Sequence, residues 1–306
     1  MTVNPAIASY VPTYATYTDY VSPTEFLNAN TGVDVSQLVP SGSTLTQEQA
    51  LLDLLARASS EADRIVQKPL AATEDIVEGE YRIWPDRTVR IPVPYKPVVA
   101  VTAVSVGYAI NAMTPLTDLS GVFVGPKVIR IPVPSVASAV SFSGNPSAMA
   151  GRGKLFVQVT YVNGWMHSNL AAATIVGAQQ IAPQSVVGAV PGLPFTIKDG
   201  PETENCVISP SYVYGSPTVL LAAPLANAHS QGATVSALPP FVKNAVIDLS
   251  KSLVKAHGSK AIVMGAIQGS IRGQRVGQPK TQTTEPGGDS DRAQAEKTLM
   301  NLRRSA

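Results

Sequence analysis

The chain has 306 residues, a formal net charge of +2 and a charged fraction of 14%, against about a quarter in average soluble proteins. Its 23 glycines and 25 prolines favour turns, strands and extended segments, so we expect a β-rich chain. The near-neutral charge argues against tight, sequence-independent binding of nucleic acid by one copy. A single cysteine, Cys206, excludes an intrachain disulfide and a cysteine-based zinc site. We expect no export signal, because the first residues show no basic segment followed by an apolar run, and no membrane span, because no apolar run reaches about 18 residues.

The first 75 residues predict an extended arm followed by two helices. Residues 1–21 show neither helical nor strand periodicity and are rich in tyrosine. Ser22-Pro23-Thr24-Glu25 combines an N-cap serine, a proline at the first helical position and a glutamate at the third, which predicts a short helix ending near Asn30. A second capping box at Thr46 predicts a helix near 46–68. Its apolar stripe consists of Leu51, Leu55, Ala58, Ala62 and Ile65.

Residues 76–239 predict a β-rich lobe, because alternation and turn residues replace the helical period. The clearest strands are 98–108 and 154–162, which are rich in β-branched and aromatic residues. Ile-Pro-Val-Pro occurs at 91–94 and again at 131–134, each time after an arginine, and indicates an internal hairpin-like repeat. Proline lacks a ladder donor, so we expect these segments to be edge strands or strand ends. Further short strands are expected at 195–198, 206–208, 218–221 and 233–238.

Residues 240–306 predict a return helix, a glycine-rich arm and a final helix. The return helix, near 240–257, has one narrow seam formed by Val242, Val246, Leu249, Leu253 and Ala256. In the arm, 261–280, glycine recurs at every fourth position from Gly265 to Gly277. Such a segment is either an unstructured linker or an arm that orders on a partner. The final helix is expected near 289–303.

Together these segments predict an α+β chain in three parts, 1–75, 76–239 and 240–306. The helices near 46–68 and 240–257 flank the insertion and are expected to pack on each other, with the C-terminal helix, in a small core. The insertion is then a large antiparallel β lobe, and the terminal arms are extended. Since short helices and extended segments bury little apolar surface, we expect contacts with other subunits to complete the fold.

No residue pattern in the sequence indicates an enzyme, a metal site or a cofactor. His167, His229 and His257 lie in no metal-binding or nucleophile-activating spacing, and Cys206 falls in an expected strand, as an inert buried thiol would. Gly151-Arg152-Gly153-Lys154 precedes a strand and is interpreted as a hairpin turn, since a phosphate loop opens onto a helix. The acidic pairs Glu74-Asp75 and Glu202/Glu204 are interpreted as solvated turns.

The order of these elements resembles the head-to-tail adaptor (connector, or head-completion) proteins of tailed bacteriophages. The resemblance rests on the capped helix at Ser22-Pro23-Thr24-Glu25-Phe26, the stretch Arg57-Ala58-Ser59-Ser60-Glu61-Ala62-Asp63 and the return helix opening Pro240-Phe241-Val242-Lys243-Asn244-Ala245-Val246. The segment Ala223-Pro224-Leu225-Ala226-Asn227-Ala228-His229, with Gly232-Ala233-Thr234-Val235-Ser236, is also similar to a β segment of such adaptors.

The resemblance implies a virion protein, made in the host cytoplasm, that forms a ring, commonly of twelve subunits, at the head–tail junction. Its partners would be further copies of itself, the portal protein, the next tail or stopper protein, the capsid as a further neighbour, and double-stranded DNA that passes through the lumen without being read. Ring contacts would fall on the helical core and portal contacts on the arm 261–280. The candidate contact residues are Leu51, Leu55, Val246, Leu249, Leu253, Ile262, Ile267, Ile271, Arg272 and Arg275.

Two other classes stay open. Another virion protein, such as a tail terminator, fibre or decoration subunit, would keep the β lobe but does not need the paired helices. A carbohydrate-binding or hydrolytic module could stack sugars on Trp84 and Trp165, although no aromatic row or convergent carboxylate pair accompanies them.

Overall fold

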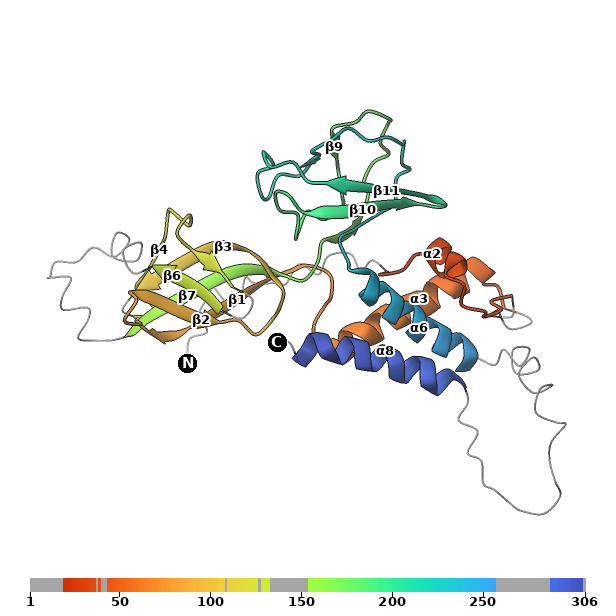
Figure 1. Cartoon of the computed structure of the whole chain (residues 1–306), viewed down its shortest axis with the longest axis horizontal. Helices are drawn as coiled ribbons and strands as arrows, with labels where there is room; N and C mark the ends of the chain where they lie inside the picture. Colours follow the sequence, from red (N-terminus) through yellow and green to blue (C-terminus); the bar gives the residue numbers. More distant parts are fainter. Residues whose placement is uncertain are drawn as a thin grey trace, which may run out of the picture.

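In a computed structural model of the chain, the structure describes residues 19–36, 38–39, 43–107, 109–125, 128–132, 154–256 and 287–304. This part of the chain contains four α-helices and several antiparallel sheets, which confirms the predicted α+β class. A helical core and two separate β domains make up an elongated molecule (Figure 1). Residues 1–18 of the predicted N-terminal arm 1–21 and the whole predicted arm 261–280 lie outside the described residues.

The helical core brings together both ends of the described chain. The predicted helices are confirmed to within two residues at each end, and both capping boxes form at Ser22 and Thr46. The side chain of each cap accepts a hydrogen bond from the backbone N–H of the third helical residue. This N–H group has no acceptor within the helix, so the cap supplies its partner. The helices are α2 (Pro23–Asn28), α3 (Gln47–Val66), α6 (Pro240–Ala256) and α8 (Gly287–Arg304).

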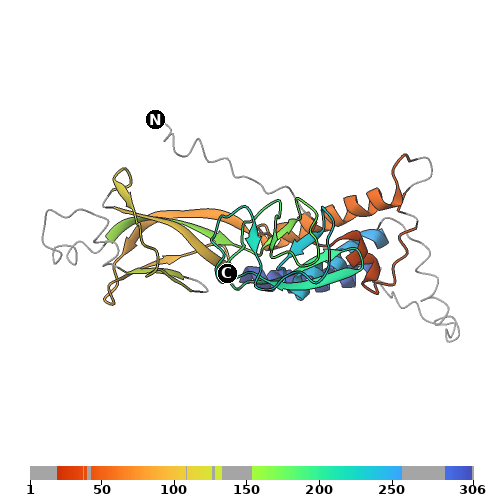
Figure 2. The same ribbon diagram turned by 90° about the horizontal axis from the view of Figure 1, so that it is seen from above.

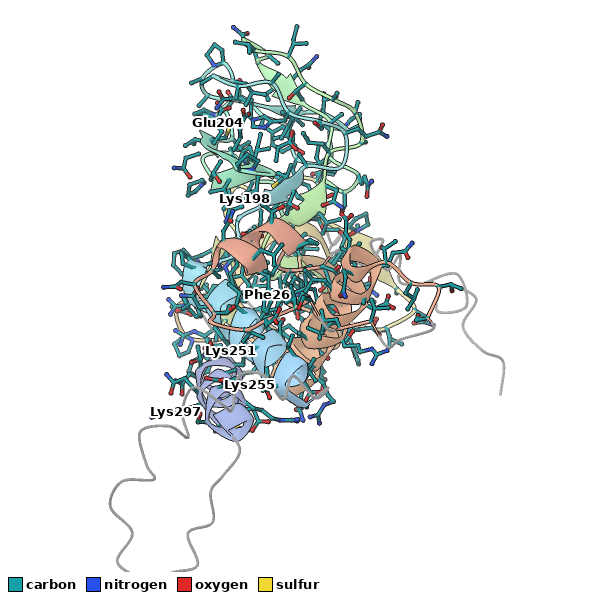
Figure 3. All side chains as sticks on the ribbon, turned by 90° about the vertical axis from the view of Figure 1, so that its right-hand side faces the viewer. Phe26, Lys198, Glu204, Lys251, Lys255 and Lys297 are labelled. Carbon is teal, nitrogen blue, oxygen red and sulfur yellow. The ribbon has the colours of Figure 1, made fainter. Side chains whose placement is uncertain are left out.

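The apolar stripes of α3, α6 and α8 meet in one hydrophobic cluster, as predicted for the two flanking helices. Phe26 of α2 lies in this cluster on the side of the second β domain (Figure 3). Tyr20, before α2, belongs to the same cluster, and its ring also contacts His167 of the second β domain. The phenolic oxygen of Tyr20 donates to Asp63 Oδ1 (2.7 Å) and accepts the backbone N–H of Leu70 (3.0 Å). These bonds attach the segment before α2 to the end of α3.

The first β domain is a sandwich of two antiparallel sheets, with strand orders β1-β7-β3-β4 and β2-β6-β5. The two strands that lead into the Ile-Pro-Val-Pro repeats pair with each other, and each repeat begins opposite residues that precede the other one: Ile91 faces Ile129, and Pro132 faces Thr88. Both prolines end their strands, as the missing donor requires. The strands are β1 (Thr73–Arg82), β2 (Thr88–Pro92), β3 (Val98–Gly107), β4 (Met113–Pro115), β5 (Phe123–Val124), β6 (Val128–Pro132) and β7 (Lys154–Asn163).

The second β domain has its own core and lies above the helices in Figure 1. It contains a four-stranded sheet of order β11-β10-β13-β8 and the pair β12-β9, all antiparallel. The view from above shows it over the helical core, while the first β domain extends away from both (Figure 2). The strands are β8 (His167–Asn169), β9 (Gln180–Ile181), β10 (Pro194–Asp199), β11 (Glu202–Val207), β12 (Val219–Leu220) and β13 (Thr234–Ser236).

The insertion that we predicted as one lobe therefore holds two hydrophobic cores. The boundary lies at Gly164, where φ is +90° and an added Cβ would lie 2.8 Å from the carbonyl oxygen of Ala71. Next to it, Trp165 exchanges backbone hydrogen bonds with Leu70 (3.0 Å) and Ala72 (2.8 Å). The chain thus enters and leaves the first β domain through two adjacent segments, and their close approach requires glycine at position 164.

Candidate interaction site

A cleft of about 680 Å³ separates the helical core from the second β domain. Its walls come from α2, the first turns of α6 and the β10–β11 hairpin, and they include the apolar side chains of Phe195, Leu238 and Ile247. Figure 3 shows Lys198 at this boundary, with the helices below it and the β domain above. The cleft is a concave surface to which three distant parts of the sequence contribute.

Glu25 joins the three elements that form the cleft. Its carboxylate accepts the backbone N–H of Ser22 (3.1 Å) as the second half of the capping box. The same carboxylate accepts hydrogen bonds from Nζ of Lys243 in α6 (2.9 Å) and from Nζ of Lys198 in β10. These two lysines are 218 and 173 residues away in sequence. Glu25 therefore caps the N-terminus of α2 and also holds the second β domain on the helical core.

The charges of this cluster are unequal, with two ammonium groups around one carboxylate. Burial alone would raise the pKa of Glu25, but the charge of Lys243 and the hydrogen bonds from Lys198, Lys243 and Ser22 outweigh it and hold that pKa below 4.5. Burial lowers the pKa of Lys243, and Glu25 opposes that shift only in part. A cleft with apolar walls and a surplus of positive charge is suited to an apolar or carboxylate-bearing side chain of a partner.

Four of the five predicted contact residues on the helices are buried inside the monomer, so their assignment to subunit contacts is wrong. Leu51, Leu55, Val246 and Leu249 are buried in the helical cluster, and Leu253 is partly buried against it. The heptad-like seams are filled by α3, α6 and α8 of the same chain, so the four buried side chains are not available to a neighbour. Leu253 keeps partial exposure.

The remaining predicted contact residues lie outside the described part of the chain. These residues are Ile262, Ile267, Ile271, Arg272 and Arg275.

The histidines and the cysteine that the structure describes have structural surroundings. His167 contacts the hydroxyl of Ser236 (2.9 Å) through Nδ1 and the carbonyl oxygen of Asp19 (3.0 Å) through Nε2. Burial, with a contribution from the charge of Glu204, raises the pKa of Cys206 to about 11, which keeps its thiol protonated at neutral pH. The third histidine, His257, lies outside the described residues.

Two acidic pairs differ from the prediction of solvated turns. Glu74 and Asp75 lie in β1, where Asp75 accepts the side-chain amide of Asn163 (2.6 Å). Glu204 accepts the backbone N–H groups of Ala226 (2.6 Å) and Asn227 (3.0 Å) and contacts Nε2 of His229 (3.1 Å). Burial alone would raise the pKa of Glu204, but these hydrogen bonds hold it below its usual value. Glu204 thus fixes the loop before β13.

Several exposed apolar side chains were not anticipated from the sequence. In the second β domain, Ile175 is 76% exposed and Val213 is 72% exposed; in the first, Phe123 is 58% exposed. The two tryptophans lie in different modules, since Trp84 is exposed on the first β domain and Trp165 packs against the helical core. They do not form a joint platform for a sugar.

Across the described ranges, no three His, Cys, Asp or Glu residues come together in a manner suited to a metal ion. None of the helices in these ranges is both long and apolar enough to cross a membrane. No protein-family model, curated protein or solved structure matches this chain.

Proposed function

We propose that this chain is a structural subunit of a tailed-bacteriophage virion that forms a ring between the portal of the head and the tail. The observation that carries the proposal is the division of the described chain into three small hydrophobic cores in an elongated molecule (Figure 1). A chain divided in this way exposes more surface per residue than one compact domain of the same length. That surface is available for contacts with several neighbours.

The helical core provides a rigid centre for such a subunit. Besides the apolar cluster, Lys251 and Lys255 of α6 both pair with Asp291 of α8, and Arg292 bridges Glu61 of α3 and Glu296. Figure 3 shows Lys251 and Lys255 where α6 faces α8. With the helices fixed to each other, the two β domains project from the helical core (Figure 1) and are the parts proposed to meet neighbours.

In the proposed assembly, each contact can be weak because it is repeated around the axis. A closed ring converts many modest contacts into one stable joint, and its matched symmetry allows simultaneous engagement of the portal. The near-neutral chain suits a channel through which DNA passes, because a strongly basic lining would retain the phosphates. The glycine-rich arm 261–280 is proposed to reach the portal.

The test is the mass of the full chain in solution, measured by light scattering after size exclusion and repeated after mixing with the portal ring. We expect particles of about twelve times the 32.0 kDa of one chain, seen as rings in negative stain. Failure to form rings both alone and with the portal would refute the proposal. Specific binding of the monomer on a glycan array would favour the carbohydrate-binding alternative.

A further inference from the structure

The outer face of the sheet β2-β6-β5 carries two arginines directly opposite each other. The register aligns Arg90 of β2 with Arg130 of β6, and Arg130 in turn with Phe123 of β5. Their neighbours Ile91 and Ile129 point into the core, so both guanidinium groups are on the solvent side. Like charges in a cross-strand pair repel, and such a pair requires a compensating interaction.

Aromatic rings flank this pair at both ends. The guanidinium carbon of Arg90 lies 4.3 Å from the ring centre of Trp84, and that of Arg130 lies 5.7 Å from the ring centre of Phe123. Both distances are within the range of cation–π attraction. Trp84, Arg90, Arg130 and Phe123 thus form one row, the basic row, with two exposed aromatic ends.

The charge compensation of the basic row is incomplete. Arg90 pairs with Asp86 (2.7 Å), which leaves Arg130, exposed on the central strand, without a carboxylate partner among the described residues. An exposed guanidinium beside an aromatic ring can receive a carboxylate with two parallel hydrogen bonds while the rings of the row cover the partner's apolar atoms. The row is therefore suited to an acidic protein surface.

An acidic surface of this kind lies on the opposite side of the same domain. Strand β1 alternates along its length, and Glu74, Ile76, Glu78, Glu80 and, at the end of the strand, Arg82 point away from the core. Glu80 pairs with Lys154 across an exposed contact (3.1 Å), whereas Glu78 accepts a hydrogen bond from the neutral amide of Gln158 (2.8 Å). The carboxylate of Glu78 thus pairs with no cationic side chain in the described part of the chain.

We propose that the basic row of one copy docks on the outer face of β1 in the next copy, with Arg130 opposite Glu78 and the exposed Ile76 beneath the aromatic side chains. The inference rests on the proposed ring. The two surfaces belong to opposite sheets of one sandwich, so the contact is heterologous: each copy offers a different face to each neighbour. Repetition of such a contact gives a ring when the rotation closes. The first β domains then form a belt, which replaces the helical seams as the site of ring contacts.

The experiment measures the concentration at which the full chain assembles, by light scattering, for four proteins: wild type, Arg130→Glu, Glu78→Arg and the double variant with both changes. Each single reversal places like charges opposite each other and is expected to raise the assembly midpoint by about tenfold or more. The double variant restores opposite charges with exchanged positions and should return toward wild type. The matched control is Lys297→Glu on the exposed side of α8, which makes the same change of net charge in another module.

The outcomes separate this inference from the proposed function. Rings that persist unchanged in Arg130→Glu overturn the docking and leave the adaptor standing, whereas a wild type that forms no rings, even with the portal, overturns both. If the reversal spares the rings but weakens binding of a double-stranded DNA oligonucleotide, the basic row contacts nucleic acid and the docking is wrong. Assembly of the wild type should also weaken between about 0.15 and 1 M salt, since the Debye length falls from about 8 to 3 Å.

Discussion

Replacing Glu25 with alanine should weaken the attachment of the second β domain to the helical core. The variant removes the carboxylate from a cluster in which the side chains of Glu25 and Lys243 are only 10% and 11% exposed. Removing one member of a buried ion pair costs about 3 to 5 kcal/mol, because the remaining charge stays buried without compensation. The lower end, about 3 kcal/mol, applies because Lys198 is 27% exposed and water can reach its ammonium group.

The assay uses the two tryptophans, which lie in different modules. In a Trp84→Phe background, fluorescence reports Trp165, which packs against the helical core next to the second β domain. With a urea m value of about 1 to 3 kcal/mol/M, Glu25→Ala should lower the unfolding midpoint by at least about 1 M. The matched control is Glu202→Ala, an exposed glutamate of β11, which should change stability by less than about 0.5 kcal/mol. Equal midpoints in the two variants would refute the role of Glu25.

The same variant makes a prediction about pH. Because the pKa of Glu25 is held below 4.5 in the folded protein, its stabilising contribution is present above the unfolded pKa and is lost as the pH falls through the folded value. The difference between wild type and Glu25→Ala should therefore be full at pH 7 and shrink below about pH 4. A difference that does not change with pH would mean that the charge of Glu25 contributes nothing.

Three further predictions concern other parts of the fold. Burial raises the pKa of Asp63 from 3.8 to about 6. The protonated carboxyl group therefore contributes about 3 kcal/mol to folding stability at low pH, and this contribution is lost as the pH rises through 6. Asp63→Asn, which has no charge to lose, should gain stability relative to wild type between about pH 4 and 7 in urea unfolding. Ile91→Ala should cost about 2 to 5 kcal/mol and lower the midpoint seen by Trp84 fluorescence alone, because Ile91 lies in the core of the first β domain; a parallel loss in the helical core would contradict separate cores. On α3, Leu55→Ala should cost a similar amount, whereas Leu52→Ala, at a position 38% exposed, should cost less than about 1 kcal/mol by thermal unfolding.

Subunit contacts could not be assigned from the apolar stripes alone. A stripe such as Leu51 and Leu55 indicates that a helix face is buried. The core of one chain and the contact between two subunits both require apolar residues, so the stripe does not distinguish them. The structure decides in favour of the interior, because α8 covers the side of α6 that α3 leaves open. The exposed residues of the basic row carry no comparable pattern in the sequence, since Arg90 and Arg130 become neighbours only through the pairing of β2 with β6.

The sequence by itself determined the local features of this protein: the two capping boxes, the helices α3 and α6, the strands β3 and β7 and the positions where proline ends a strand. Each depends on residues within a few positions of one another, where periodicity and hydrogen-bonding capacity act directly. Only the tertiary structure decided that the insertion forms two cores and that Glu25 meets Lys198 and Lys243 across 173 and 218 residues. Such contacts depend on which strands pair and which faces meet, and that choice is made by the burial of the whole chain and not by any single segment.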